Sequence, residues 1–302
     1  MADSHKVGVV TVTFNSGAMV DGFMQSLLAQ SYNDFELYVI DNASSDDTLE
    51  KLASYRDPRV HVIPNRDNRG VAAANNQGIQ ASLESGCRSV WLINNDTEFD
   101  SGLLAILVAE LEARPCDMIV PKIMYYHPPD RVWFAGGYFS RLRAYAPLHR
   151  GKHELDRGQF DTPGWIEYAP TCCLLVRRTV FEQIGLMDET YFIYFDDADF
   201  CFRAKRAGLK IWYHPCGVLL HKEGSLTGGT QSPFVLRLSA RNKLYFLKKN
   251  LGPVWPVWAA LYQIYLLGRL LTGRDSTSAF RLRQQSLVEG VRLKVSDDTP
   301  RP

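Results

Sequence analysis

The sequence predicts an α/β fold with a mostly parallel central sheet, helices on both faces and a helical segment at the C-terminus. Three observations support this. Short β-branched or apolar runs alternate with helical patterns through residues 1–122, and polar clusters directly follow several of these runs. The chain has 302 residues, of which 46% are hydrophobic, enough to build one large domain with an appendage.

The first half reads as alternating strands and helices. The run at 6–13 is β-branched and apolar, as expected for a buried parallel strand, and apolar residues recur with helical spacing over 19–30. Serine and aspartate at 44–47 are typical of a helix start. The further strands expected are 35–40, 60–63, 89–93 and 118–121, and the further helices are 48–55, 70–85 and 103–113.

The second half is less regular. Residues 174–176 and 209–212 read as apolar strands, with a helix through 204–207 before the second. The stretch 141–164 is rich in charge, glycine and proline and predicts a mobile loop, within which 152–161 is expected to be disordered without ligand. We expect a catalytic domain over 1–230, with halves at 1–122 and 123–230. A helical extension over 231–302 is expected to end in a disordered tail at 297–302.

Charge and cysteine content exclude some classes of protein. The formal net charge is +1, which gives no general electrostatic reason to bind nucleic acid. Six cysteines occur without a CxxC pair, which favours reduced thiols in a cytoplasmic protein over a zinc site or a disulfide framework. No signal peptide is visible in the short polar N-terminus.

Polar clusters follow three of the expected strands, at 14–16, 41–42 and 94–96, and a fourth cluster at 65–76 precedes a helix. Ligands of open α/β sheets bind beyond the carboxyl ends of the strands. Each cluster alone is compatible with an ordinary turn, but four at the same sheet edge favour a binding site.

Neither GxxxxGK[ST] nor GxGxxG follows the first strand, which argues against a P-loop enzyme or a dinucleotide dehydrogenase. Asp96 is the candidate oxygen ligand for Mg²⁺ or Mn²⁺.

Three carboxylates lie within four positions, at Asp196, Asp197 and Asp199, and aromatic residues flank them. Carboxylates among apolar neighbours are usually paired, metal-bound or catalytic, and a raised pKa suits a general base. The alternative is an acidic helix N-terminus. The two interpretations are compatible.

The ordered set of motifs resembles the inverting nucleotide-sugar glycosyltransferases of family two, which have a GT-A fold. Over roughly residues 6 to 225, the chain is most similar within that family to bacterial rhamnosyltransferases and galactofuranosyltransferases of surface polysaccharide synthesis. The matching segments are Val10-Thr11-Val12-Thr13-Phe14-Asn15, Val39-Ile40-Asp41-Asn42-Ala43-Ser44-Ser45-Asp46, the run Asn68 to Asn76, Leu92-Ile93-Asn94-Asn95-Asp96-Thr97, Gly185-Leu186-Met187-Asp188-Glu189 and Phe195-Asp196-Asp197-Ala198-Asp199.

The resemblance implies roles for individual residues. Asp197 matches the catalytic base. Asp96 matches the last acid of the DxD metal motif, whose first position here is Asn94, and His221 matches a downstream metal ligand. The acceptor-side or sugar-side candidates are Trp133, Gly136, Gly137, Asp196 and Asp199. The implied donor-binding residues are Thr13, Phe14, Asn15, Asp41, Asn68, Gly70, Asn75, Asn95 and Asp96.

The implied reaction moves a sugar from a dTDP- or UDP-sugar to a glycan or lipid-linked glycan, with L-rhamnose from dTDP-rhamnose as the first expectation. Galactofuranosyl, glucosyl and N-acetylglucosaminyl transfer remain open. So does a nucleotide-sugar-binding protein that has lost turnover through the Asn94 change. A nucleotidyltransferase is a more remote alternative. For His221 a core or capping role remains the alternative to metal binding, and His214 is expected to be structural.

The C-terminal segment 254–272 contains one charge, Arg269, and four Trp or Tyr residues. One interpretation is a helix lying in a membrane interface, on the inner face of the cell membrane, after a basic approach segment. The other is a helix packed on the catalytic domain or on a homodimer partner. A membrane span is third, because Pro256, Gln263 and Arg269 weaken it.

Overall fold

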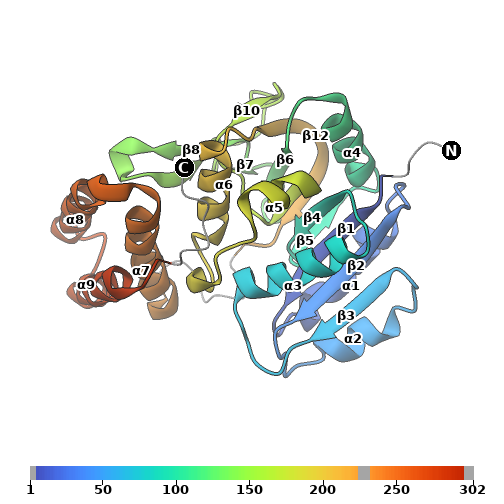
Figure 1. Ribbon diagram of the computed structural model, residues 1–302, viewed down its shortest axis with the longest axis horizontal. Coiled ribbons are helices and arrows are strands. Elements are labelled where there is room, and N and C mark those ends of the chain that lie inside the picture. Colours follow the sequence, from blue (N-terminus) through green and yellow to red (C-terminus); the bar gives the residue numbers. More distant parts are fainter. Residues whose placement is uncertain (1–4, 224–231, 296–302) are drawn as a thin grey trace.

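The computed structural model describes residues 5–223 and 232–295 (Figure 1). Its main sheet has ten strands in the order β10-β12-β6-β11-β4-β1-β2-β3, with β5 paired to β12 and β7 paired to β6. The sheet is mixed and mostly parallel, and helices cover both of its faces, as the sequence predicts. The model thereby confirms the predicted fold class.

The first half forms the parallel part of this sheet. β1 pairs in parallel with both β2 and β4, and β2 pairs in parallel with β3. These strands are buried apolar runs, with Val7, Val9 and Val10 of β1 fully enclosed. The elements are β1 (Val7–Thr13), α1 (Gly17–Leu28), β2 (Phe35–Asp41), α2 (Thr48–Ser54), β3 (Val60–Pro64), α3 (Val71–Glu84) and β4 (Ser89–Ile93).

The second half adds antiparallel strands. β11 lies antiparallel between β4 and β6, and β12 runs parallel to β6. β12 starts at Ile211 and continues, through an irregularity between His214 and Leu219, to His221. The predicted strand at 209–212 covers only its start. The elements up to that strand are β5 (Thr97–Phe99), α4 (Leu103–Ala113), β6 (Met118–Tyr125), β7 (Val132–Phe134), β8 (Gly137–Ser140), the 3₁₀ helix η1 (Arg141–Arg143), β9 (Ala146–His149), β10 (Gly164–Ile166), β11 (Cys173–Arg177), α5 (Arg178–Ile184), η2 (Glu189–Tyr191), α6 (Asp196–Arg206) and β12 (Ile211–His221).

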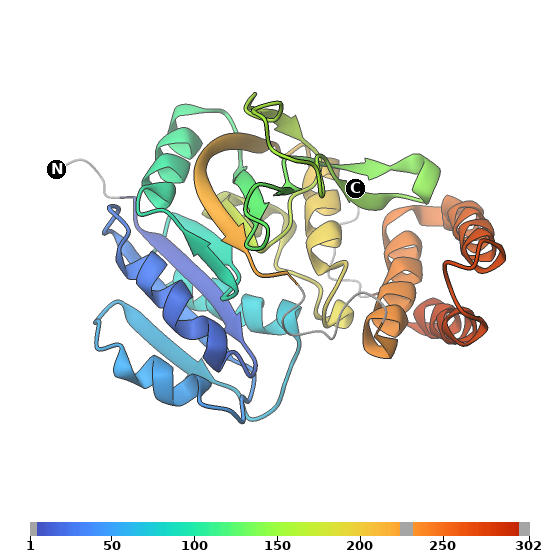
Figure 2. The same ribbon diagram turned by 180° about the vertical axis from the view of Figure 1, so that it is seen from behind.

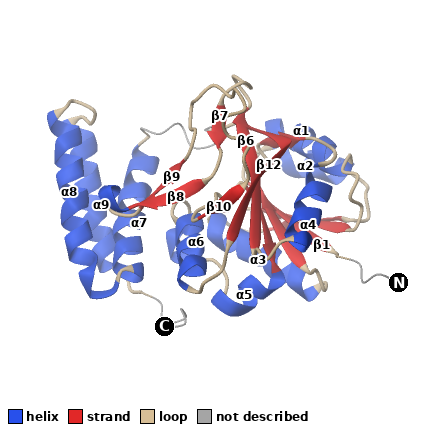
Figure 3. Ribbon diagram, turned by 90° about the horizontal axis from the view of Figure 1, so that it is seen from above, coloured by secondary structure: helices blue, strands red, loops and turns tan. Residues whose placement is uncertain are grey.

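The helices form two layers on the sheet. Helices α3, α5 and α6 cover one face, and α1, α2 and α4 cover the other (Figures 2 and 3). Buried small residues at 72–74 let α3 lie close to the sheet. The carboxyl ends of β1, β2 and β4 therefore meet at one edge, where the polar clusters of the sequence gather.

The stretch 141–164, for which the sequence predicts a mobile loop, contains η1 and β9 and then lacks regular secondary structure over 150–163. Its start folds back on β8 as the antiparallel strand β9. The segment 152–161 is held by Lys122, whose Nζ lies 2.6 Å from carboxylate oxygens of both Asp156 and Asp161. Phe160 is buried in the main core. Sequence composition misses this because the partner lysine is on β6, far away in the chain.

The C-terminal extension consists of α7 (Pro233–Asn250), η3 (Gly252–Val254), α8 (Trp255–Leu271) and α9 (Thr277–Arg292). Ser232 caps α7 by accepting a hydrogen bond from the Val235 amide, and Pro233 occupies its first turn. Trp255, Trp258 and Tyr262 pack against the main core. Among the described helices, none combines the length and hydropathy needed to cross a membrane. The predicted disordered tail, 297–302, lies outside the described residues.

Candidate active site

A pocket of about 850 Å³ opens at the carboxyl ends of the parallel strands. Its walls come from loops after β1, β2, β4 and β12, from the start of α3 and α6, and from the first turns of α7. The predicted site residues that line it are Phe14, Asn68, Gly70, Asn75, Asn95, Asp96, Trp133, Asp196, Asp197 and His221. Thr13, Asn15, Asp41, Gly136, Gly137 and Asp199 lie outside its lining.

Asp41 is buried beneath the pocket instead of lining it. Its Oδ1 accepts hydrogen bonds from Thr13 Oγ1 at 2.8 Å and Ser44 Oγ at 2.5 Å, and its Oδ2 accepts one from the Ser44 amide. Asn15 acts similarly, because its Oδ1 accepts hydrogen bonds from the amide and hydroxyl of Ser45. In this structure Thr13, Asn15 and Asp41 shape the loops of the pocket and do not line it.

The next residue, Asn42, lines the pocket in place of Asp41. Its Nδ2 donates to the Gly70 carbonyl at 3.1 Å, while Asn68 Oδ1 accepts from the Gly70 amide at 3.0 Å. Gly70 has φ +83°, and a Cβ there would meet the Phe192 ring at 2.5 Å. Only glycine fits this turn without strain, which is why the loop can pass so close to Phe192.

Asp96 and His221 meet at the base of the pocket. Asp96 follows β4 and His221 ends β12, and Asp96 Oδ1 lies 3.3 Å from His221 Nε2. Both side chains are buried, and neither Asp96 Oδ1 nor His221 Nδ1 has a well-aligned hydrogen-bond partner among the described residues. Buried polar atoms without partners are costly and mark sites that bind something. The Asn95 side chain has a structural role, because its Nδ2 donates a hydrogen bond to the Val12 carbonyl.

Trp133 forms a wall of the pocket. Its indole is buried and meets the His221 ring edge-on, with centroids 4.5 Å apart. Gly136 and Gly137 do not line the pocket, and a Cβ at Gly137 would meet the Tyr168 carbonyl at 2.5 Å. The acceptor-contact role expected for both glycines does not fit this placement. Gly137 instead permits the close approach of Tyr168.

Tyr168 touches the predicted base directly. Its Oη donates to Asp197 Oδ2 at 2.6 Å, while the Ala198 amide donates to Asp197 Oδ1 at 2.7 Å. Burial raises the pKa of Asp197 above its ordinary value, against the opposing effect of the Tyr168 hydrogen bond. Burial and the charge of Asp197 raise the pKa of the neighbouring Asp196 as well. The two carboxyls titrate as a pair, and one of them can hold a proton near neutral pH.

The backbone just before these carboxylates is unusual. Phe192, Tyr194 and Phe195 all have positive φ, between 65° and 69°. Such conformations cost about 1–3 kcal/mol each in non-glycine residues and persist only where surrounding contacts enforce them. Asn242 of α7 supplies those contacts, because its Nδ2 lies 2.8 Å from each of three carbonyls at 191, 193 and 194.

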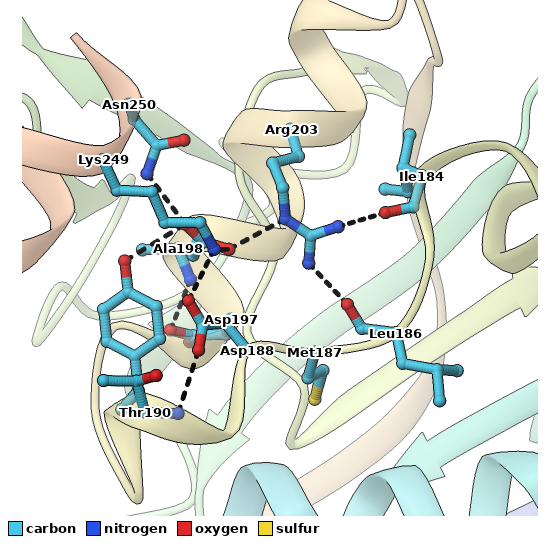
Figure 4. Close-up of polar contacts among 12 residues, drawn as sticks. Ile184, Leu186, Met187, Asp188, Thr190, Asp197, Ala198, Arg203, Lys249 and Asn250 are labelled. Atoms are coloured by element: carbon cyan, nitrogen blue, oxygen red, sulfur yellow. Dashed lines mark hydrogen bonds and ion pairs between the residues drawn. The ribbon is translucent and has the colours of Figure 1, made fainter. Parts of the chain in front are cut away.

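Asp199 is fully buried outside the pocket lining, in a network that joins α6 to α7 and whose partners Arg203, Lys249 and Asn250 are labelled in Figure 4. Its Oδ2 lies 2.8 Å from Arg203 Nε and 2.9 Å from Lys249 Nζ. Lys249 also pairs with Asp188 at 2.7 Å, and Asn250 donates to Asp199 Oδ1. Burial alone would raise the pKa of Asp199, but Lys249 and Arg203 outweigh it and lower that pKa. The expectation that Asp199 contacts the acceptor does not fit this enclosed position.

Sequence reasoning missed several residues of the pocket. Tyr168 has no local signal, because its partner Asp197 lies 29 positions away. The extension also contributes Phe234, Val235 and Ser239 to the lining, although the predicted catalytic domain ends at 230. His214 lies outside the pocket on β12, 3.6 Å from Glu110, which agrees with a structural role.

The Asp196 carboxyl gives a pH-dependent prediction. The Asp196 carboxyl binds its proton more tightly in the folded protein than in the unfolded chain. As pH rises above about 3.9 towards the raised pKa of the folded state, ionisation of Asp196 therefore favours the unfolded chain. We expect Asp196→Asn to raise the free energy of unfolding at pH 7 and to change it little at pH 4. Urea denaturation at the two pH values measures this, with exposed Asp67→Asn as the control. An equal gain at both pH values contradicts the assignment.

Comparison with known proteins agrees with this geometry. The model of the family described as "Glycosyl transferase family 2" matches residues 8–185. Among solved structures, a crystal structure of GalNAc-T7 with UDP, GalNAc and Mn²⁺ superposes with a TM-score of 0.63 at 18% identity, covering 95% of this chain and 55% of that one. A mannosyltransferase from Pyrobaculum calidifontis in complex with GDP-Man and Mn²⁺ gives 0.57 at 14% identity, covering 96% and 85%. The fold is therefore that of the GT-A glycosyltransferases.

The chain belongs to glycosyl transferase family 2. It is 28% identical over 315 residues to the N-acetylglucosaminyl-diphospho-decaprenol L-rhamnosyltransferase of Mycobacterium tuberculosis, covering 93% of this chain and 97% of the relative. It is 28% identical over 219 residues to the low-salt glycan biosynthesis hexosyltransferase Agl10 of Haloferax volcanii, covering 71% and 67%. It is 25% identical over 228 residues to the dTDP-rhamnosyl transferase RfbF of Shigella flexneri, covering 72% of each.

Proposed function

We propose that this protein is an inverting glycosyltransferase that moves L-rhamnose from dTDP-rhamnose to a lipid-linked or free glycan acceptor. The observation that carries the proposal is Asp197, a carboxylate with a raised pKa at the pocket wall, fixed by Tyr168 Oη at 2.6 Å. Its fixed orientation suits general-base chemistry. The choice of rhamnose is supported by the names of two relatives.

The proposed reaction is a single displacement. Asp197 accepts the proton of an acceptor hydroxyl while the hydroxyl oxygen forms a bond to the anomeric carbon of the donor. The bond from that carbon to the diphosphate oxygen breaks, and its electron pair leaves with the nucleoside diphosphate. Attack from the face opposite the leaving group inverts the anomeric configuration. The strained loop at 192–195, held by Asn242, fixes the direction from which Asp197 meets the hydroxyl.

Asp96 and His221 fit a divalent cation as two of its ligands. Asp96 Oδ1 and His221 Nε2 lie 3.3 Å apart, so the carboxylate and the imidazole could both face one cation such as Mg²⁺ or Mn²⁺. Among the described residues there is no group of three or more His, Cys, Asp or Glu side chains that could hold a metal. Donor phosphate oxygens and water would supply the other ligands of such a cation. When bound, the cation neutralises charge on the diphosphate leaving group.

The metal role makes a separate prediction. Asp96→Ala should weaken donor binding in Mg²⁺ or Mn²⁺ to the level that the wild type shows in EDTA, because only one protein ligand remains. In EDTA the variant and the wild type should bind alike. Calorimetric titration with the donor nucleotide, with and without metal, measures this. Equal affinity of the wild type in metal and in EDTA excludes the metal role.

A donor screen tests the substrate. Release of nucleoside diphosphate is measured with dTDP-rhamnose, UDP-galactofuranose, UDP-glucose and UDP-N-acetylglucosamine, each with a lipid-linked N-acetylglucosamine acceptor. We expect acceptor-dependent release from dTDP-rhamnose and little from the three UDP-sugars. Turnover of a UDP-sugar alone rules out the rhamnose assignment while leaving glycosyl transfer intact. Binding of donors without turnover of any indicates a nucleotide-sugar-binding protein.

A further inference from the structure

The two faces of α8 differ in what covers them. Trp258 meets the Tyr145 ring at 4.9 Å, and Tyr262 lies beside Lys243 Nζ, so the aromatic face packs inward. The opposite face is exposed along the helix, and its large apolar residues are Val257, Leu261, Ile264, Tyr265, Leu267 and Leu271. The one charged residue of α8, Arg269, borders this face at Tyr265 and is paired with Asp275. Contiguous exposed apolar surface of this kind marks an interaction site.

The position of α8 leaves this face free of the catalytic core. The helix lies at the end of the molecule farthest from β1–β3, beside α9 (Figures 1 and 3). The packing interpretation therefore holds for the inner face of α8 only. The aromatic residues that suggested an interfacial helix mostly face inward, and aliphatic residues form the outer surface.

Charge around this face favours an anionic partner. Residues 233–295 contain eleven Lys and Arg but only two acids, Asp275 and Glu289. Both acids are already paired, Asp275 with Arg269 and Arg283, and Glu289 with Arg237. The exposed cations Arg274, Arg281, Arg292 and Lys294 make no ion pair within 5–223 and 232–295.

We propose that the outer face of α8, with the exposed cations of α9 and the α8–α9 turn, docks this protein on an anionic membrane surface. Aliphatic residues enter the headgroup boundary and the cations meet lipid phosphates, as in interfacial helices. A second copy of the chain fits less well. A two-fold dimer through this face brings the same cations of both copies together, and the two acids of the extension within 232–295, Asp275 and Glu289, are already paired.

The first turn of α7 links the docking face to the active-site pocket. That the pocket receives a glycan acceptor rests on the proposed function. Phe234 and Val235 line the active-site pocket, while their neighbours Pro233 and Leu236 line a groove of about 440 Å³ together with Arg274. The first turn of α7 therefore separates the pocket from the α8–α9 turn. A protein docked through α8 holds that turn at the membrane, where a lipid-linked acceptor would present its sugar.

Vesicle flotation of the full-length protein tests the proposal. Vesicles of phosphatidylcholine with 30% phosphatidylglycerol, a composition chosen for the assay, should carry the wild type to the top of the gradient at about 0.1 M salt. Leu261→Glu with Ile264→Glu should lower the bound fraction about tenfold or more, because both replace exposed aliphatic groups by anions. Arg281→Gln and Arg292→Gln should each lower partitioning about fivefold on anionic vesicles and little on pure phosphatidylcholine.

Val218→Glu is the matched control, an exposed aliphatic residue on β12, and should float like the wild type. A wild type that stays at the bottom overturns the proposal. A dimer interface on this face would also overturn the proposal. In that case light scattering would show that the wild type is a dimer, and the Leu261→Glu and Ile264→Glu changes would convert it to a monomer without changing flotation. Donor titration without vesicles separates the two claims: flotation without donor binding contradicts the proposed function, and donor binding without flotation contradicts the docking surface.

Discussion

Replacing Asp197 with asparagine is expected to lower glycosyl transfer about 10²–10⁴-fold while donor affinity stays close to that of the wild type. The amide keeps the size of the side chain but accepts a proton poorly. Because the proposed metal ligands, Asp96 and His221, are untouched, the donor should still bind. Steady-state transfer rates together with calorimetric donor titration measure both halves of the prediction.

Tyr168→Phe is the companion variant, since it removes the 2.6 Å hydrogen bond to Asp197 but leaves the carboxylate. This hydrogen bond lowers the pKa of Asp197, so its loss should move the acidic limb of the pH–rate profile to higher pH. The base must be ionised, and activity therefore falls as pH drops through its pKa. A folded Asp197→Asn protein with near-wild-type transfer would refute the assignment of the base.

Replacing Lys249 with methionine is expected to lower the free energy of unfolding by about 3–5 kcal/mol at pH 7, since it leaves two buried carboxylates without their shared cation. The Lys249 side chain is 2% exposed, and those of Asp188 and Asp199 are 8% and 0% exposed. Burial opposes ionisation of both acids, but Lys249 helps to lower the pKa of each. This stabilisation is present above about pH 3.9 and is lost as pH falls through the lowered folded pKa values.

Chemical denaturation of the variant across pH values gives the measurement. Lys248→Met is the matched control on the same helix, because Lys248 Nζ donates only to the Val291 and Leu293 carbonyls among the described groups. Lys249→Arg should retain part of the stability, because it keeps the charge. A loss for Lys249→Met no larger than that for Lys248→Met would show that the network does not stabilise the junction of α6 and α7.

The elements that the sequence predicts well are those with strong local patterns. The buried run of β4 and the helix α4 match their predicted ranges, because continuous apolar residues bounded by turn formers leave little choice of boundary. The strand ending at His221 is longer than predicted, because its continuation beyond His214 depends on pairing with β5 and β6. Long-range pairing of that kind has no local sequence signal.

The candidate site also divides into features that the sequence predicts and features that it does not. The sequence motifs predict that Asp96, Asp197 and His221 share one pocket, and all three line it. The direction in which a carboxylate points is set by neighbours that the motif does not contain. Asp41 turns to Ser44, and Asp199 turns to Lys249, so both lie outside the pocket lining. For α8, the sequence predicts the helix, but which of its faces packs inward depends on where Tyr145 and Lys243 lie.

The anomeric configuration of the product tests the central claim most directly. The donor that turns over is incubated with acceptor, and the H1–C1 coupling constant of the transferred sugar is measured by NMR. A single displacement with Asp197 as base predicts a product whose anomeric configuration is opposite to that of the donor. A product with the configuration of the donor would contradict single displacement and with it the role given to Asp197.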